Sequence, residues 1–167
     1  MDSLDKKEKD FLEVYEQYAD SVFRHCIFRV SDREKAKDLV QETFVKTWVY
    51  INAGNDISNL KAFVFKVARN LIIDHYRRSK EISLDFLMEA GFDRATHNED
   101  EIFTNAEHSQ VKKALDKIKP EYKEMIILRF IEGLSPKEMS EIIGISENVV
   151  SVRIHRAIKK LKEKLDP

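Results

Sequence analysis

The scarcity of chain-breaking residues is the strongest constraint that this sequence places on its fold. Only 4 glycines and 3 prolines occur among 167 residues, while 43% of the residues are hydrophobic and 35% are charged. Glycine and proline interrupt regular structure more often than other residues, so long helices should dominate. We therefore expect an all-α protein with two small helical domains joined by an acidic linker, the second containing a helix-turn-helix.

Three amphipathic helices are expected in a first domain that spans residues 1–80. Apolar side chains recur at three- and four-residue intervals over residues 9–29, from Ala36 to about residue 52, and from Leu60 to Arg78. Basic and polar side chains fall together on another face of the third helix. A polar loop that ends near Asn59 should separate the second helix from the third.

Residues 81–103 lack sustained helical periodicity, and we expect them to form the linker, with one short helical turn near Asp85–Ala90. The stretch 81–107 carries 8 acidic residues and 1 basic residue. Such a segment can act as a simple soluble tether, but its negative charge disfavours a DNA groove. Helical patterning resumes near Thr104, which opens a second domain over residues 104–167.

The net charge of −1 hides an uneven distribution along the chain. Residues 61–80 carry 6 basic residues and 1 acidic residue, and residues 108–167 carry 13 basic and 9 acidic residues. Two basic blocks on either side of an acidic one indicate two surfaces that bind a polyanion.

A helix-turn-helix is predicted near the C-terminus. Ser135 precedes a proline, and Glu138 lies three residues after Ser135. This is the pattern of a capping box at the start of a helix. Gly144 can adopt the left-handed conformation that a tight turn needs, and Ser146 can cap the next helix. Within this motif we expect Met139, Ile143, Ile145 and Val150 to be buried.

The second helix of this motif has two faces of different chemistry. Val150, Ile154, Ala157, Ile158, Leu161 and Leu165 form an apolar arc that should face the domain. The other arc combines basic groups for phosphates, an amide and guanidinium groups for base edges, and methyl groups for thymine. The simpler alternative is a solvated basic face that favours the helix dipole. The candidate DNA-binding residues here are Ser146, Asn148, Val149, Val152, Arg153, Arg156, Lys159 and Lys160.

Three segments resemble functional parts of bacterial RNA polymerase sigma factors. The stretch from Gly144 to Leu161 resembles the segment that binds the minus-thirty-five promoter element, and Ala36 to Trp48 resembles the helix that grips RNA polymerase. The stretch from Leu60 to Arg78 resembles the helix that reads the minus-ten element. With two domains and a short linker, the chain is similar to an extracytoplasmic-function (ECF) sigma factor, although the family commonly has threonine at Val149 and a small polar residue at Val152.

The resemblance adds a partner to an acidic patch. One stretch of little more than a helical turn contains Asp38, Gln41 and Glu42, and aromatic side chains lie beside it. One of these is Trp48, to which we assign a structural role in the helix bundle. Such a surface can dock a basic helix, although acidic helical residues are often only solvated. The resemblance implies that these three residues contact the coiled-coil clamp helices of the polymerase largest subunit.

The third helix carries side chains that are suited to separated DNA strands. Cations can bind the phosphate backbone, aromatic rings can stack on bases, and amides can read an extruded base. By resemblance, Lys66 and Asn70 lie at minus-ten contact positions, and the loop from Asn52 to Asn59 corresponds to one that captures a flipped base. The whole minus-ten candidate set is Asn52, Asn55, Asn59, Phe63, Lys66, Arg69, Asn70, Asp74, Arg77 and Arg78.

The remaining features argue against other classes of protein. The single cysteine, Cys26, cannot close an intramolecular disulfide, the five histidines lack partners at metal-ligand spacing, and no glycine-rich phosphate loop occurs. No signal peptide or membrane span is predicted.

We therefore expect a cytoplasmic protein without catalytic residues, cofactor, metal or small-molecule substrate. The partners implied by the resemblance are core RNA polymerase, promoter DNA and a membrane-linked anti-sigma factor. The alternative is a dimeric helix-turn-helix regulator whose N-terminal half senses a ligand or assembles subunits.

Overall fold

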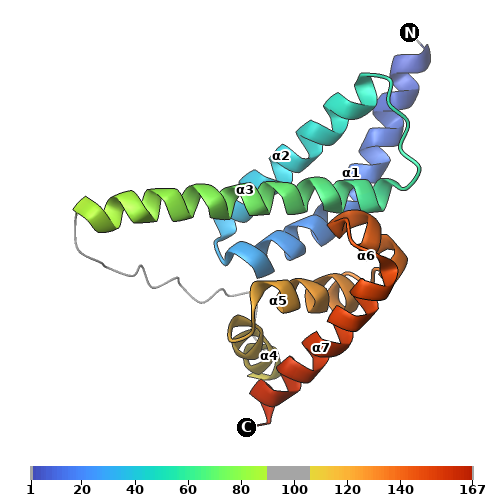
Figure 1. The fold of residues 1–167 in the computed structure, drawn as a ribbon. Helices are drawn as coiled ribbons and strands as arrows, with labels where there is room; N and C mark the ends of the chain where they lie inside the picture. The colour runs from blue at the N-terminus through green and yellow to red at the C-terminus, as the bar shows by residue number, and fades with distance from the viewer. Residues whose placement is uncertain (1, 90–105, 167) are drawn as a thin grey trace. The chain divides into compact units, whose positions relative to one another are not determined.

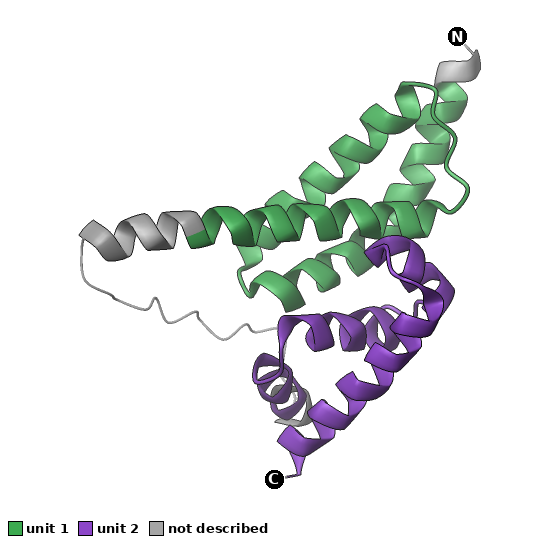
Figure 2. Cartoon of the chain, viewed as in Figure 1, with its two compact units in different colours: residues 1–99 green, residues 100–167 purple. Residues whose placement is uncertain are grey.

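The computed structural model describes the backbone of residues 2–89 and 106–166, and the regular elements in these ranges are helices (Figure 1). The expected all-α fold is confirmed. Contacts divide the chain into two compact units, residues 1–99 and residues 100–167 (Figure 2). Each unit is described by itself.

Unit 1 is a bundle of three helices, α1 (Asp2–Val30), α2 (Arg33–Asn52) and α3 (Leu60–Glu89), each of which packs against the other two. The turn between α1 and α2 is short because Ser31 adopts a left-handed φ of 53°. Asp32 then caps α2, and its Oδ1 accepts hydrogen bonds from the backbone N–H groups of Glu34 and Lys35 at 3.0 and 3.2 Å. These donors lack partners inside the helix, so the cap stabilises the start of α2.

The core of unit 1 draws on all three helices. Val22 and Cys26 of α1 are fully buried, and so are Phe65 and Ile72 of α3. Burial of a side chain of this size contributes about 1.5–3 kcal/mol. The polar core residue Thr43 of α2 is satisfied locally, because its hydroxyl donates to the Leu39 carbonyl at 2.6 Å. The apolar spacing of the sequence therefore predicts the buried faces of these helices.

Two helices of unit 1 are longer than the sequence predicts. The first begins at Asp2 rather than near residue 9, and α3 continues to Glu89 rather than ending at Arg78. No glycine or proline lies between residues 79 and 89, so nothing in that stretch stops a helix that is already formed. The short turn expected from Asp85 is thus the end of α3, and residues 90–103 of the predicted linker lie outside the described residues.

Unit 2 contains α4 (Ala106–Asp116), α5 (Pro120–Ile126), a short π-helical segment η1 (Ile127–Ile131), α6 (Pro136–Ile143) and α7 (Glu147–Leu165). The last helix packs against α4, α5 and α6. Apolar side chains from each of these elements are fully buried around α7, among them Leu115, Met125, Leu128, Met139 and Val150.

The π-helical segment is a feature that the sequence does not predict. The N–H of Glu132 donates to the carbonyl of Ile127 at 2.9 Å, which is the five-residue spacing of a π-helix. The wider turn changes which side chains face the core. Phe130 is 57% exposed, whereas Ile127 and Leu128 are fully buried.

The helix-turn-helix forms as predicted. Ser135 Oγ accepts from the Glu138 N–H at 3.1 Å, and the Glu138 carboxylate accepts from the Ser135 N–H at 3.2 Å. Gly144 has the expected left-handed φ of 81°, and the Ser146 hydroxyl caps α7 by accepting from the Val149 N–H at 3.2 Å. The predicted capping box, turn and second cap are confirmed.

Three predicted core positions in this motif are corrected. Ile142, not Ile143, is the buried isoleucine of α6, and Ile143 and Ile145 are half-buried. Leu165 is 40% exposed because it lies at the last residue of α7. A helix end has no following turn to cover its side chains, so the apolar arc loses its cover there.

Candidate functional site

The outward face of α7 carries the predicted DNA-contacting residues. Asn148 and Arg156 are exposed, and Val149 and Val152 are 41% and 49% exposed. Val150 and Ala157, on the opposite side, are fully buried. The burial of one face therefore fixes the orientation of the other, and the exposed face presents amide, guanidinium and methyl groups together.

The remaining candidates on α7 differ in their freedom to bind. Lys159 is exposed, and Lys160 is exposed but lies 3.7 Å from the Glu163 carboxylate in a surface ion pair. Such an exposed pair is weak, so Lys160 can exchange it for a phosphate. Arg153 is half-buried, and the Ser146 hydroxyl is already engaged in the helix cap. Ser146 therefore positions the start of α7.

The turn before α7 is held by a contact that the sequence analysis missed. The Ser140 hydroxyl donates to the carbonyl of Ile145, which joins α6 to the three-residue turn. The sequence predicts no hydrogen bond for Ser140. The only sequence signal for this bond is that Ser140 lies one helical turn before Gly144, close enough to reach the backbone of the turn.

An exposed stripe runs along α3. Phe63, Lys66, Asn70, Asp74 and Arg77 lie at helical spacings of three and four residues and so share one face. Lys66, Asn70, Asp74 and Arg77 are exposed, and Phe63 at the start of the stripe is half-buried. The face therefore combines an aromatic ring, an amide and two cations with one carboxylate.

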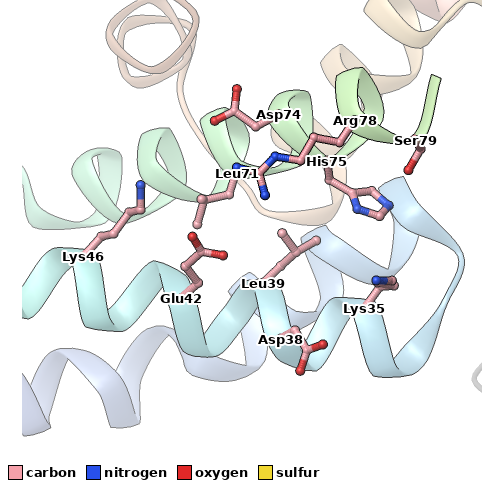
Figure 3. Close-up of a pocket in the computed structure, with 10 residues that line it drawn as sticks. All are labelled: Lys35, Asp38, Leu39, Glu42, Lys46, Leu71, Asp74, His75, Arg78 and Ser79. Atoms are coloured by element: carbon pink, nitrogen blue, oxygen red, sulfur yellow. The ribbon is translucent and has the colours of Figure 1, made fainter. Parts of the chain in front are cut away.

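Two predicted cations of α3 lie on either side of this stripe. Arg69 is half-buried and lies on the side facing α1, where its charge reaches His25. Arg78 is exposed and lines a pocket between α2 and α3 (Figure 3). Arg69 is thus less available to a ligand than the residues of the stripe.

The loop before α3 uses two of its predicted asparagines within the fold. Asn59 Oδ1 accepts from the Ala62 N–H at 3.0 Å, and the Asn59 carbonyl accepts from the Phe63 N–H at 3.0 Å, so Asn59 caps α3. Asn55 Nδ2 donates to the Tyr50 carbonyl at 3.1 Å. Asn52, the last residue of α2, is exposed. Both hydrogen-bonded asparagines therefore shape the loop.

The three acidic and amide residues of α2 do not share one groove. Asp38, Gln41 and Glu42 are all exposed. Asp38 and Glu42 line the pocket of about 330 Å³ between α2 and α3, where the Glu42 carboxylate points toward α3 (Figure 3). Gln41 instead lines a groove of about 810 Å³ between α1 and α2.

The groove between α1 and α2 has an aromatic floor. Phe11 lies with its ring centroid 5.2 Å from that of Trp48, and Tyr15 lies 4.9 Å from Phe44. Trp48 is half-buried, in keeping with the structural role that we assign to it. Arg33, Lys37 and Asp20 also line the groove. The surface beside Gln41 therefore combines aromatic rings with charged side chains of both signs.

Two histidines of unit 1 have pKa values below the ordinary value. Burial lowers the pKa of His25 to about 3, with smaller contributions from the positive charges of Arg29 and Arg69. Burial also lowers the pKa of His75, in the pocket between α2 and α3, and the charge of Lys35 adds to this effect while Asp32 opposes it. Both rings are therefore neutral near pH 7, so neither adds positive charge to the exposed faces.

One exposed aromatic residue near the candidate site is absent from the predicted set. Tyr50 of α2 lies with its ring centroid 4.6 Å from that of Phe63, and 39% of Tyr50 is exposed. The only sequence signal that could have placed Tyr50 in this set is its position. It lies three residues before Ala53, at the end of the helix that leads into the candidate loop.

Among the residues that the structure describes, no group of three or more His, Cys, Asp or Glu side chains is placed to hold a metal ion. No helix in residues 2–89 or 106–166 has the length and apolar character needed to cross a membrane.

Comparisons with known proteins match both units. Residues 14–82 match sigma-70 region 2, and residues 108–161 match sigma-70 region 4. The ECF RNA polymerase sigma factor SigM of Bacillus subtilis is 31% identical over 156 residues, which cover 90% of this chain and 91% of SigM.

A second curated relative and a solved structure agree with these matches. The ECF RNA polymerase sigma factor BldN of Streptomyces coelicolor is 28% identical over 158 residues, and this chain spans 58% of its length. The sigma factor RpoE from Bartonella quintana, solved in complex with the anti-sigma factor NepR, is 27% identical with a TM-score of 0.75. That alignment covers 94% of this chain and 97% of the RpoE chain.

Proposed function

The chain belongs to the ECF family of RNA polymerase sigma factors and directs transcription initiation at promoters, and from this premise we propose how its surfaces divide the work. Unit 1 docks on core RNA polymerase through α2 and engages the minus-ten element through α3. Unit 2 binds the minus-thirty-five element as duplex through α7. No step requires a catalytic group, because the polymerase performs the chemistry.

The assignment of unit 2 rests on the exposed face of α7. A helix that follows a tight turn fits the major groove, and side chains near its start reach base edges. Asn148, Val149 and Val152 lie in the first turns of α7, while Arg156 and Lys159 follow on the same exposed side. The first group is placed to read bases, and the second to hold phosphates or read guanine.

The assignment of α3 rests on the composition of its exposed stripe. A closed duplex is bound mainly by cations at phosphates, whereas separated strands also offer unstacked bases. The stripe begins with Phe63 and places Asn70 between Lys66 and Asp74. An amide on such a face can pair with the edge of an unpaired base, and we propose that Asn70 reads one in the opened minus-ten element.

The docking of α2 on polymerase rests on Asp38 and Glu42. Both carboxylates are exposed and lie one helical turn apart, which suits a basic helix packed across α2. Gln41 would contact the same partner from the side of the groove that faces α1. Because core polymerase acts in the bacterial cytoplasm, we place the protein there.

An anti-sigma factor is a further proposed partner. The structural relative RpoE is described in complex with the anti-sigma factor NepR. We propose that this chain is likewise held inactive by an anti-sigma protein linked to the membrane. Addition of the candidate inhibitor to a reconstituted transcription reaction should then abolish initiation by this chain and leave initiation by the housekeeping sigma factor unchanged.

The observation that carries the proposal is the order of the two matched regions, each with its own exposed binding face. Core polymerase should transcribe fragmented genomic DNA from new start sites only when the chain is added, and sequencing of RNA 5′ ends identifies them. The chain alone should bind the same promoters weakly. Tight binding of duplex by a dimer of the chain, without polymerase and without new start sites, would instead support the dimeric regulator.

A further inference from the structure

An aromatic pair joins the end of α2 to the start of α3. Tyr50 is two residues from the last residue of α2, and Phe63 is in the first turn of α3. Their ring centroids are 4.6 Å apart and their planes are tilted by 32°, which is within the contact range of aromatic pairs. The pair therefore bridges the two helices on either side of the loop 53–59.

The backbone around the pair is held in place from both sides. Asn55 Nδ2 donates to the Tyr50 carbonyl at 3.1 Å, and Asn59 caps the helix turn that contains Phe63. Gly54 adopts a φ of +89°, a left-handed conformation that glycine supplies without strain and that reverses the chain toward α3. The rings are thus positioned before any ligand binds.

A purely structural role explains only part of this arrangement. The aromatic residues that build the core of unit 1 are nearly inaccessible, as Phe44 and Phe65 are. Tyr50 instead leaves 39% of its surface exposed, although its ring already stacks on Phe63. Part of Tyr50 is therefore accessible to a planar group.

The surroundings of the pair indicate what that group is. Phe63 begins the exposed stripe of α3 and is followed on the same face by Lys66 and Asn70. The rise of a helix places Asn70 about 10 Å along the axis from Phe63. A planar ligand on Tyr50 would therefore lie at the end of a helix face that carries a cation and an amide, and this combination of groups binds single-stranded nucleic acid.

We propose that Tyr50, supported by Phe63, is a stacking surface for an unpaired base of the opened promoter strand, separate from the base that Asn70 reads. This inference rests on the proposed role of α3 in binding the minus-ten strand. It adds a residue outside α3 to that site and assigns it shape recognition without base-edge hydrogen bonds. Tyr50 should therefore strengthen strand binding with little preference for one base over another.

The test uses the full chain assembled with core polymerase and a single-stranded oligonucleotide that covers the minus-ten element. The base 2-aminopurine is placed at successive positions, because its fluorescence is quenched when it stacks. Tyr50→Leu should weaken strand binding by about 5-fold to 150-fold, the range measured when one stacking aromatic is lost, and should relieve quenching at one position. Tyr50→Phe should retain both properties.

The matched control is Tyr76→Leu. Tyr76 is another exposed tyrosine, and it lies on the side of α3 away from the stripe that begins with Phe63. It should leave strand affinity and quenching unchanged. Circular dichroism and polymerase binding check that each variant folds and docks. If Tyr50→Leu does not fold, Tyr50→Trp decides the matter, because deeper quenching at the same position supports stacking and unchanged quenching overturns it.

The outcomes separate this inference from the function on which it rests. If Asn70→Ala weakens strand binding and a folded Tyr50→Leu does not, the stacking role of Tyr50 is overturned and the role of α3 stands. If neither variant changes strand binding, the assignment of α3 to the minus-ten strand is overturned, and the inference with it.

Discussion

Gln41 and Glu42 are neighbours in the chain but line grooves on two different sides of α2. Gln41 lines the groove with an aromatic floor against α1, whereas Glu42 lines the charged pocket against α3. Consecutive residues of a helix are rotated by about 100°, so one helix can present different chemistry to two grooves. A partner that packs across α2 would meet an amide on one side and carboxylates on the other.

The first prediction concerns this division. Asp38→Ala combined with Glu42→Ala should weaken binding of core polymerase more strongly than Gln41→Ala does, since only the carboxylates attract a basic helix over a distance. The loss should shrink as salt is raised, because salt screens exposed charges. Titration of labelled polymerase at two salt concentrations measures both effects.

A matched control removes two carboxylates elsewhere. Glu13 and Glu16 are exposed on α1 and line neither groove, so their replacement by alanine should leave polymerase affinity unchanged. Equal weakening by the control pair would mean that the loss of affinity comes from the change in net charge alone. That result would contradict the assignment of Asp38 and Glu42.

The sequence predicts the helices and the helix-turn-helix because their signals are local. The capping box of Ser135 and Glu138, the turn at Gly144 and the buried face of α7 each depend on residues within one or two turns. The exposed stripe of α3 follows from the same periodicity. These parts of the candidate site are therefore predictable from the sequence.

Other parts depend on contacts between elements that are distant in the sequence. The stacking of Tyr50 on Phe63 and the proximity of Arg69 to His25 require the packing of separate helices. The π-helical hydrogen bond from Glu132 to Ile127 changes the register of one turn without any glycine or proline to mark it. Periodicity alone assigns no side chain to one groove rather than another.

The second prediction separates the two proposed DNA surfaces. Arg156→Ala should weaken binding of the holoenzyme to duplex that carries only the minus-thirty-five element, by about 1–3 kcal/mol if Arg156 reads a base. Asn70→Ala should leave that duplex binding intact and impair strand opening at the minus-ten element. Gel-shift titration measures the first effect, and permanganate footprinting measures the second.

Lys162→Ala is the control for Arg156, since it removes one exposed cation from a different side of α7. It should have little effect on duplex affinity. Normal opening by Asn70→Ala, together with a failure of Arg156→Ala on a template that is already melted, would reverse the proposed roles of the two units.

The third prediction concerns the buried ring of His25. Its pKa is about 3 in the folded protein and near 6.5 in the unfolded chain, so only the unfolded chain takes up a proton between these values. The free energy of unfolding should therefore fall as the pH drops from about 6.5 toward 3, by up to about 1.4 kcal/mol per pH unit from this group.

Within the described structure neither ring nitrogen of His25 has a hydrogen-bond partner. His25→Leu should consequently retain the stability of the native chain at pH 7.5 and lose less stability at pH 5. Urea denaturation at the two pH values measures this difference. An identical pH dependence in both proteins would mean that His25 is not the group responsible.

The last prediction concerns Asn59, which the sequence analysis places among the minus-ten residues and the structure uses as a cap. Its Oδ1 accepts a hydrogen bond from the Ala62 N–H at the start of α3. Asn59→Ala should destabilise the protein by about 1 kcal/mol, and Asn59→Ser should restore most of that loss because serine also caps helices. Thermal unfolding measures both changes.

If Asn59 acts on DNA only by shaping the loop, Asn59→Ser should open promoters as well as the native chain does. Full stability of Asn59→Ser combined with poor strand opening would instead identify the Asn59 amide as a direct reader of the strand, since serine lacks the paired donor and acceptor that an amide offers to a base edge.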